Sequence, residues 1–208
     1  GLCPGRDPDH ATRGAGMERG GRRGVGGQHH AAAALAAVAE LGLDEPVLAV
    51  VFDGTGWGPD ETAWGGEFLL VDGARWTRVN TFRALRLPGG ERAIREVWRL
   101  ALSALRDAYG AAEALALAPR LGALRDVPPS SRETVTRAMA AGVMAAPARG
   151  VGRWFDAVGA LALGLPRADF DAHVAIALEE CAGDDVTSGY PVGVPVAVVA
   201  FDHRYNGT

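Results

Sequence analysis

Residues 47–70 read VLAVVFDGTGWGPDETAWGGEFLL, and this stretch decides the fold. The apolar run Val47–Phe52 is too short for an isolated helix and is rich in β-branched residues, so it predicts a strand buried on both faces. We expect the strand to stop at Asp53-Gly54-Thr55-Gly56, where the glycines leave backbone N–H groups and one carboxylate facing outward. Such a turn suits a phosphate, a metal-bound phosphate or a nucleotide.

The same stretch allows a second interpretation, a hairpin that binds nothing. An Asp-Gly pair between two apolar runs is a strong hairpin signal, and residues 64–70 (WGGEFLL) have the character of a returning strand. Taken alone, the spacing favours this hairpin, so the ligand hypothesis depends on the rest of the chain.

The composition excludes several classes of function. A chain of 208 residues, 48% of them hydrophobic, forms one large domain or two small ones. All 21 basic residues are arginine, which we interpret as genome composition, and a net charge of −4 spread along the chain gives no basic stripe for nucleic acid. No apolar run approaches the roughly 18 residues of a membrane span, and no leader resembles a signal peptide.

The two cysteines, Cys3 and Cys181, are far apart and have no cysteine neighbours. They therefore predict neither a disulfide framework nor a cysteine zinc site. We expect a cytoplasmic protein with neither nucleic acid nor a membrane as a partner.

The N-terminal residues 1–27 are dominated by glycine and arginine and predict a partly flexible segment. Because the first residue is Gly1 rather than Met, we expect the chain to begin inside a longer one. Within the segment, DPDHAT (residues 7–12) is typical of a turn that opens a short helix.

An Ala-rich helix is predicted over Gln28–Leu43, with His29 and His30 in its first turn. Adjacent helical residues point about 100° apart, so these two histidines are not the i, i+4 pair that holds a metal from one helix face. Without a further ligand, the simplest interpretation is a solvated helix end.

The remaining pattern predicts strands first and helices after. Residues 74–88 carry partly alternating apolar and arginine residues and predict one or two strands of an antiparallel meander. A strong amphipathic helix follows, from Glu91 to Gly110. Its apolar face consists of Ile94, Val97, Trp98, Ala101 and Leu105. Further helices are expected at residues 111–121, 131–144, 151–163 and 170–182. This order describes an α/β or α+β lobe.

Several segments together resemble one known family. QHH at 28–30, FDGTGWGPDETAWGGEFLL at 52–70, LPGGE at 87–91, ARGVGRWFD at 148–156 and FDAH at 170–173 follow the order and intervals of HypF, the carbamoyltransferase family that matures nickel–iron hydrogenases. The resemblance is to the large carbamoyl-transferring domain, which is similar to threonylcarbamoyl transferases.

The resemblance implies a fold and a division of the chain. The implied fold is an actin-like, sugar-kinase-like lobe of ribonuclease-H type, with a mixed sheet and packed helices. We expect residues 28–190 to form this carbamoyltransferase-like domain, C-terminally incomplete, and residues 191–208 to form an atypical tail.

The resemblance also implies a reaction. Carbamoyl-adenylate, made elsewhere from ATP and carbamoyl phosphate, is bound in a cleft, and its carbamoyl group passes to the C-terminal cysteine of a partner protein of hydrogenase maturation. A divalent metal, iron or zinc, polarises the carbamoyl group in this family.

The family's nucleotide-binding positions are carried over residue by residue. Asp53 to Gly56 resemble the phosphate turn, Gly152 the glycine that lets the backbone approach the nucleoside, and Asp156 the acid on the ribose. The other interpretation of Asp156 is a charge on the exposed side of a helix. Asp171 stands where the family has Glu in a YEGQ-like run, but FDAH lacks the Gly and Gln of that run.

The family's metal run is close to QHHHAH, whose first and last histidines lie on one helix face. In this chain, His29 corresponds to the first histidine of that run, and Ala33 replaces the last histidine. His29 and His30 are therefore the remaining candidates for metal ligands. The resemblance therefore predicts an impaired metal site, and no catalytic residue is assigned.

Two other functions remain open. One is a non-catalytic remnant that binds a nucleotide or docks a partner, which Ala33 favours. The other is an O-carbamoyltransferase acting on a small molecule, which the WGGEFL and LPGGE runs disfavour.

Overall fold

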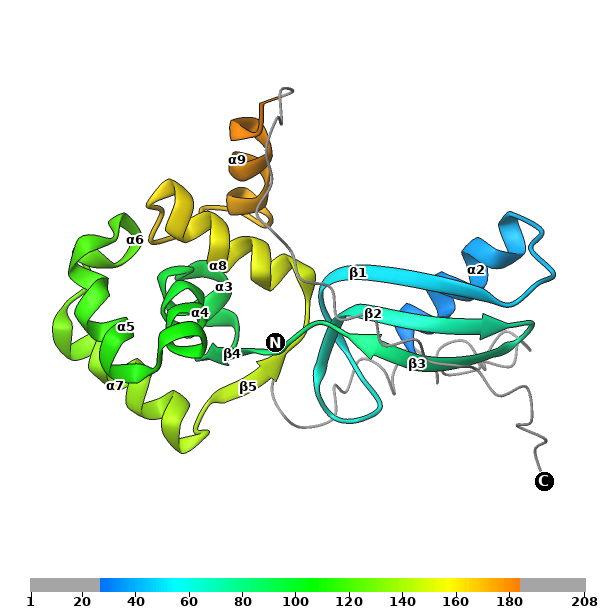
Figure 1. Cartoon of the computed structure of the whole chain (residues 1–208), viewed down its shortest axis with the longest axis horizontal. Coiled ribbons are helices and arrows are strands. Elements are labelled where there is room, and N and C mark those ends of the chain that lie inside the picture. The colour runs from blue at the N-terminus through cyan, green and yellow to red at the C-terminus, as the bar shows by residue number, and fades with distance from the viewer. Residues whose placement is uncertain (1–26, 184–208) are drawn as a thin grey trace, which may run out of the picture.

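A hairpin of two long strands spans one half of the computed structural model, which describes residues 27–183 (Figure 1). Strand β1 (Val47–Trp57) runs antiparallel to β2 (Ala63–Asp72), with Val47 opposite Val71. The Gly58 N–H donates to the Thr62 carbonyl at 2.9 Å and closes the connection. The prediction of a returning strand at WGGEFLL is thus confirmed, but the turn lies at residues 58–62 and not at Asp-Gly.

Strand β1 differs from its prediction in two ways. It lies at an edge of the sheet, and its outward residues Leu48, Val50 and Phe52 are 54%, 48% and 60% exposed, so a strand buried on both faces is wrong. It also does not stop at Asp53, because β1 continues to Trp57 with a register irregularity between Phe52 and Gly56. The residues predicted to form a phosphate turn, Asp53 to Gly56, therefore form a bulge inside a strand.

Three shorter strands complete a mixed sheet. Strand β3 (Arg75–Thr81) pairs antiparallel with β2, which confirms the predicted meander. Strands β4 (Leu85–Pro88) and β5 (Ala145–Ala148) pair antiparallel with each other, and β5 joins β2 in parallel at Ala63 and Ala148. Strand β5 was not predicted, since its sequence AAPA carries no strand signal.

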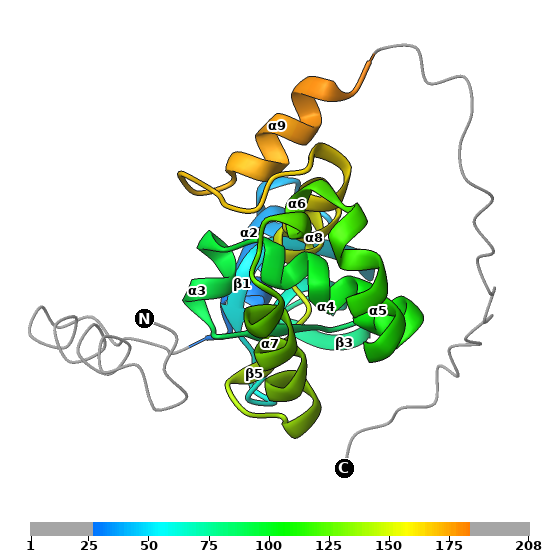
Figure 2. The ribbon, with the colours of Figure 1, turned by 90° about the vertical axis from the view of Figure 1, so that its left-hand side faces the viewer.

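Helix α2 lies along the hairpin, and most of the other helices gather at the opposite end of the molecule (Figures 1 and 2). The helices of the described residues are α2 (His29–Glu40), α3 (Glu91–Arg95), α4 (Trp98–Tyr109), α5 (Ala111–Leu117), a 3-10 turn (Ala118–Arg120), α6 (Gly122–Arg125), α7 (Pro129–Ala141), α8 (Val151–Leu163) and α9 (His173–Cys181). The predicted helix at 151–163 is confirmed residue for residue.

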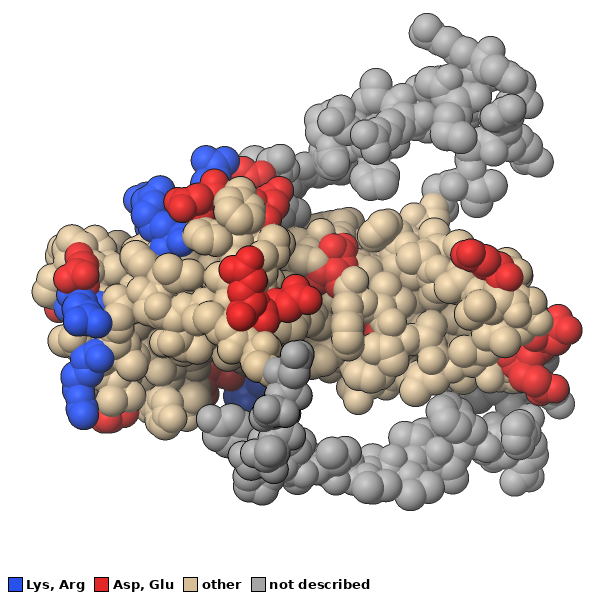
Figure 3. Space-filling model, turned by 90° about the horizontal axis from the view of Figure 1, so that it is seen from above, with Lys and Arg blue, Asp and Glu red and all other residues tan. Residues whose placement is uncertain are grey.

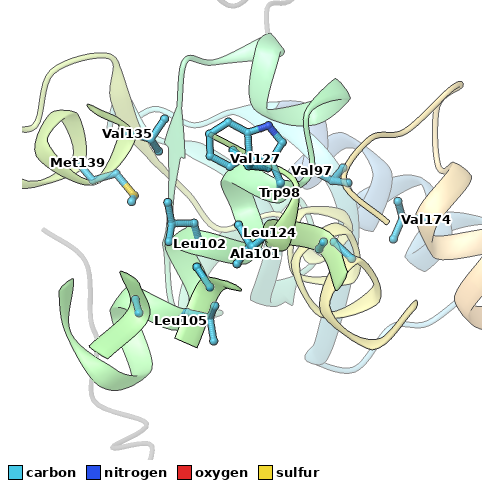
Figure 4. Packing of buried hydrophobic residues seen from close by; sticks show 14 of the residues in the cluster. Val97, Trp98, Ala101, Leu102, Leu105, Leu124, Val127, Val135, Met139 and Val174 are labelled. Carbon is cyan, nitrogen blue, oxygen red and sulfur yellow. The ribbon is translucent and has the colours of Figure 1, made fainter. Parts of the chain in front are cut away.

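Three apolar clusters hold the layers together. Helix α2 places Ala31 and Ala34 against Trp64, Leu69 and Val71 on one face of the hairpin. A second cluster joins the short strands to the helices and includes Leu85, Leu87 and Leu100. The largest cluster lies among the helices and is centred on α4 (Figure 4). Its members include the predicted apolar face of that helix, now seen to be buried: Val97, Trp98, Ala101 and Leu105.

The helix predicted from Glu91 to Gly110 is two helices. At Glu96 the backbone leaves helical geometry, with φ −92° and ψ 70°. A neighbouring loop takes over the hydrogen bonds of a continuous helix: the Trp98 N–H donates to the Pro166 carbonyl at 3.1 Å, and the Ala168 N–H donates to the Arg95 carbonyl at 2.8 Å. Tertiary hydrogen bonds thus break a segment whose local pattern is helical throughout.

Other boundaries shift by a few residues. Helix α7 begins at Pro129, two residues before the predicted start, because proline suits the first helical position. The helix predicted at 111–121 is divided into α5 and the 3-10 turn. Residues 7–12, Cys3 and the tail 191–208 lie outside the described residues.

The described residues contain no helix that combines the length and the apolar character of a membrane span. On the face seen in Figure 3, the arginines lie over the helical half, whereas the sheet half shows acidic and uncharged side chains. No continuous basic stripe crosses this face.

Candidate functional site

Three backbone segments meet without intervening side chains at the bulge of β1. A Cβ added at Gly65 would lie 2.6 Å from the Asp53 carbonyl oxygen, and one added at Gly150 would overlap the Gly54 carbonyl oxygen. One added at Gly152 would lie 2.9 Å from the Gly54 Cα. We call these four glycines, Gly54, Gly65, Gly150 and Gly152, the glycine junction. Only residues without a Cβ allow this approach.

The glycine junction places the N-terminus of α8 against the bulge. Gly150 is the N-cap residue and has no side chain to accept from the first N–H groups of the helix. The structure therefore brings together two predicted elements, Asp53 to Gly56 and Gly152. It also adds Gly150, which the sequence analysis missed. The spacing of two glycines around Val151 at a helix start was the signal that could have identified it.

The carboxylate of Asp53 does not face outward as predicted. Its Oδ1 accepts from the Gly54 N–H at 2.6 Å, and its Oδ2 lies 3.3 Å from His30 Nε2 and 3.8 Å from His29 Nε2. The Thr55 hydroxyl donates to the Gly54 carbonyl at 2.6 Å. The Asp53 carboxylate and the Gly54 N–H, which were expected to be free for a ligand, thus bind other groups of the protein.

The two histidines also differ from expectation. His30 is fully buried and not solvated, while the His29 side chain is 71% exposed. Although they are adjacent on α2, both rings reach the same Asp53 oxygen, because the bulge crosses the first turn of the helix. Burial lowers the pKa of His30, with the Asp53 carboxylate acting in the opposite direction, so the ring is neutral at pH 7.

Gln28 determines which nitrogen of His30 carries the proton. Its Oε1 accepts from the Ala31 N–H at 2.8 Å, so its Nε2 is the atom that lies 2.7 Å from His30 Nδ1. An amide nitrogen only donates, and Nδ1 must therefore be the acceptor. The proton of the neutral ring is then on Nε2, facing Asp53.

These residues do not fit a divalent metal as they are arranged. Within residues 27–183, no group of three or more His, Cys, Asp or Glu side chains is arranged to hold a metal ion. A metal bound to His30 would need the Nε2 lone pair, and that atom carries the proton. The metal roles of His29 and His30 stay predictions, and we derive no chemical step through a metal.

A second feature lies one helical turn further along α8. Asp156 is only 4% exposed, which contradicts the interpretation of a charge on an exposed helix face. Burial raises its pKa, Arg153 lowers it, and Asp171 raises it. Arg153 Nη2 lies 3.0 Å from Asp156 Oδ2, but the geometry is not that of a hydrogen bond, so Oδ2 remains an acceptor without a donor.

Asp156 and Asp171 line the same cavity of about 150 Å³. Arg95, Arg153 and Asp169 also contribute to its wall. Typical ligand pockets enclose roughly 300–1,000 Å³, so this cavity is smaller than a typical site for a whole ligand. Helix α8 therefore connects two predicted binding elements, the glycine junction at its first turn and an acidic cavity at its second.

Comparison with known proteins decides the family. The family model described as "Carbamoyltransferase, Kae1-like Domain, second subdomain" matches residues 49–203. The chain belongs to the HypF carbamoyltransferase family. The match includes the bulge of β1, the glycine junction and all three acidic residues of the cavity.

Relatives of known sequence support this membership. A carbamoyltransferase HypF homolog of Cupriavidus necator is 39% identical over 165 residues, which are 79% of this chain and 40% of the relative. The HypF of Rhizobium leguminosarum bv. viciae is 38% identical over 169 residues, which are 80% of this chain and 21% of the relative. The chain thus spans two fifths or less of the length of these relatives.

Solved HypF structures share the fold. A crystal structure of full-length HypF in a phosphate- and nucleotide-bound form is 28% identical, with a TM-score of 0.68 over 78% of this chain and 25% of that one. The HypF of T. kodakarensis is 23% identical, with a TM-score of 0.71 over 89% of this chain and 25% of that one. At that identity, the second comparison concerns the fold alone.

Proposed function

We propose that this chain is part of the carbamoyl-transferring domain of a HypF-type enzyme and that its fold is an actin-like lobe of ribonuclease-H type. It binds carbamoyl-adenylate and passes the carbamoyl group to the C-terminal cysteine of a partner protein of hydrogenase maturation. The observation that carries the proposal is the placement of the phosphate turn, Gly152, Asp156 and Asp171 along the first two turns of α8.

Each part of the site has a chemical role in this proposal. The N-terminus of α8 carries uncapped N–H groups and the positive end of the helix dipole, both of which favour a phosphate. The buried Asp156 carboxylate is in an ion pair with Arg153, but its Oδ2 lacks a hydrogen-bond donor, and a ribose hydroxyl would supply a donor to this carboxylate. The distance between the two elements is one helical turn, about 5.4 Å, which suits the phosphate and ribose of one nucleotide.

The transfer itself is an acyl substitution. The cysteine sulfur attacks the carbamoyl carbon, a C–S bond forms, the bond from that carbon to the phosphate oxygen breaks, and AMP leaves. The thiol proton passes to solvent. No described residue is assigned as the base, so the chain's own contribution is binding and orientation.

Calorimetric titration with AMP and with a non-hydrolysable carbamoyl-adenylate analogue tests the proposal. Replacing Asp156 by Ala removes a hydrogen bond to a charged acceptor, so we expect a loss of affinity of roughly 10- to 100-fold. Asp72→Asn is the matched control, because the Asp72 side chain is exposed and makes no hydrogen bond or ion pair within residues 27–183. Full affinity of the folded Asp156→Ala protein would overturn the assignment.

A second candidate is nucleotide binding without transfer, favoured by Ala33 and by the arrangement around His30. Both candidates predict that AMP binds. Mass spectrometry of a peptide with a C-terminal cysteine, incubated with the chain and carbamoyl-adenylate, separates them. Thiocarbamate formation supports transfer, and binding without it supports the second candidate.

A further inference from the structure

We infer that His30 is a positioning residue, which holds the Asp53 carboxylate and the phosphate turn through a proton fixed on Nε2. The inference deepens the proposed function, because it assigns how the phosphate turn of that same site is kept in shape. It rests on a chain of contacts from the start of α2 to the glycine junction.

The first contact fixes the amide of Gln28. Gln28 is the N-cap residue of α2, and its Oε1 accepts from the Ala31 N–H at 2.8 Å. A rotation of the amide by 180° would place two donors against each other at this cap. The Gln28 Nε2 is therefore directed at His30 Nδ1, at 2.7 Å.

The second contact fixes the ring of His30. The ring is fully buried, its centroid lies 6.1 Å from that of Trp64, and a Cβ at Gly56 would overlap its Cε1. The ring thus packs directly on the backbone of the phosphate turn. A larger residue than glycine at position 56 would displace it.

The third contact reaches the turn. His30 Nε2 lies 3.3 Å from Asp53 Oδ2, near enough for electrostatic attraction but without the geometry of a full hydrogen bond. Hydrogen bonds in unliganded sites are often loose and tighten when the ligand binds. The other Asp53 oxygen already accepts from the Gly54 N–H. The attraction between His30 and the Asp53 carboxylate therefore also fixes the position of the turn backbone.

This assignment differs from the predicted metal role of His30. A metal on Nε2 would drive the proton to Nδ1, where the Gln28 amide already donates at 2.7 Å. Two donors would then face each other in a buried place, which is costly. His30 therefore acts through its N–H and not through a lone pair at Nε2.

Long-range ¹H–¹⁵N spectra of the histidine rings test the proton position without any ligand. The signals of His30 are identified by their loss in His30→Gln. We expect the Nε2–H tautomer for His30, with its signals unchanged by one equivalent of zinc. In the Gln28→Glu variant, a carboxylate replaces the amide beside His30 Nδ1. Because a carboxylate accepts and cannot donate, we expect the His30 proton to move to Nδ1 in this variant. An Nδ1–H tautomer in the unaltered chain, or stoichiometric zinc shifts at His30, would overturn the inference.

A pair of variants tests the positioning role. Gln at position 30 keeps an N–H donor near the place of Nε2, whereas Asn presents its amide near the place of Nδ1. We expect His30→Gln to bind the carbamoyl-adenylate analogue within about 3-fold of the unaltered chain and His30→Asn to bind about 10-fold more weakly. Glu40→Gln, at an exposed position of α2, is the control.

Equal binding by folded His30→Gln and His30→Asn proteins would also overturn the positioning role. If the unaltered chain binds no nucleotide, the proposed function fails, and the ring spectra still decide where the proton of His30 lies. The two failures are therefore distinguishable.

Discussion

Asp60 fixes the connection between β1 and β2, and we predict that its replacement by Asn lowers the free energy of unfolding. One carboxylate oxygen accepts from Trp64 Nε1 at 2.7 Å and from the Thr62 hydroxyl at 2.8 Å. The other accepts from Arg78 Nη2 at 2.8 Å. Burial alone would raise the pKa of Asp60, but hydrogen bonds from Thr62, Trp64 and Arg78 outweigh it and lower the pKa to about 2.

The magnitude follows from this pKa. A folded-state pKa of about 2, against 3.8 for the free carboxyl group, corresponds to about 2.5 kcal/mol of preference for the ionised form. The side chain is 35% exposed, and solvent screening reduces the contribution to about 1 kcal/mol. In Asp60→Asn, the amide nitrogen meets Arg78 as a second donor, so we expect a loss of about 1 kcal/mol in the free energy of unfolding at pH 7.

The pH dependence separates this mechanism from a simple packing defect. Because the folded pKa is below the unfolded one, the stabilisation is present above pH 3.8 and is lost as the pH falls through about 2. Urea unfolding of the two proteins, followed by tryptophan fluorescence, should show a difference at pH 7 that is about halved near pH 3. Asp72→Asn is the control. A difference that is the same at pH 7 and pH 3 would refute this account of Asp60.

Two further predictions concern the site. Gly150→Ala should lower the free energy of unfolding by about 1–3 kcal/mol, because the added methyl group overlaps the Gly54 carbonyl. Gly27→Ala, where the methyl group enters open space, is the control and should leave the urea unfolding curve unchanged. Asp156→Asn should raise the thermal unfolding midpoint at pH 7. Burial raises the pKa of Asp156 in the folded state above 3.8, so the ionised carboxylate destabilises the fold at pH 7. The increase in the midpoint should vanish below pH 3.8, where the carboxyl group is protonated in both states. A lower midpoint at pH 7 would contradict the second prediction.

Local patterns were sufficient wherever neighbours in the sequence decide the structure. The helix at Val151–Leu163 and the buried face of α4 follow from apolar spacing, and the returning strand β2 follows from the run WGGEFLL. The order of these segments also carried the family resemblance. These elements need no knowledge of distant contacts.

The remaining features depend on residues that are distant in the sequence. The break at Glu96 arises from hydrogen bonds with residues 166–168, and β5 exists because its partners are present, since AAPA alone has no strand signal. The orientation of Asp53 toward His30 depends on the packing of α2 across the bulge. Spacing along one segment contains no information about such contacts, so the sequence analysis named Asp53 to Gly56 and Gly152 but missed Gly65, Gly150 and the way in which these residues meet.

The glycine junction also bears on the order in which the chain folds. It joins residues 54 and 65 of the hairpin to residues 150 and 152 at the start of α8, so nearly the whole chain between them must be arranged before it forms. Glycine loses more conformational freedom than other residues when it is ordered. The junction is therefore expected to be among the last regions to order and the first to open. A ligand that contacts both sides would close it and thereby stabilise the sheet and the helical layer as one unit.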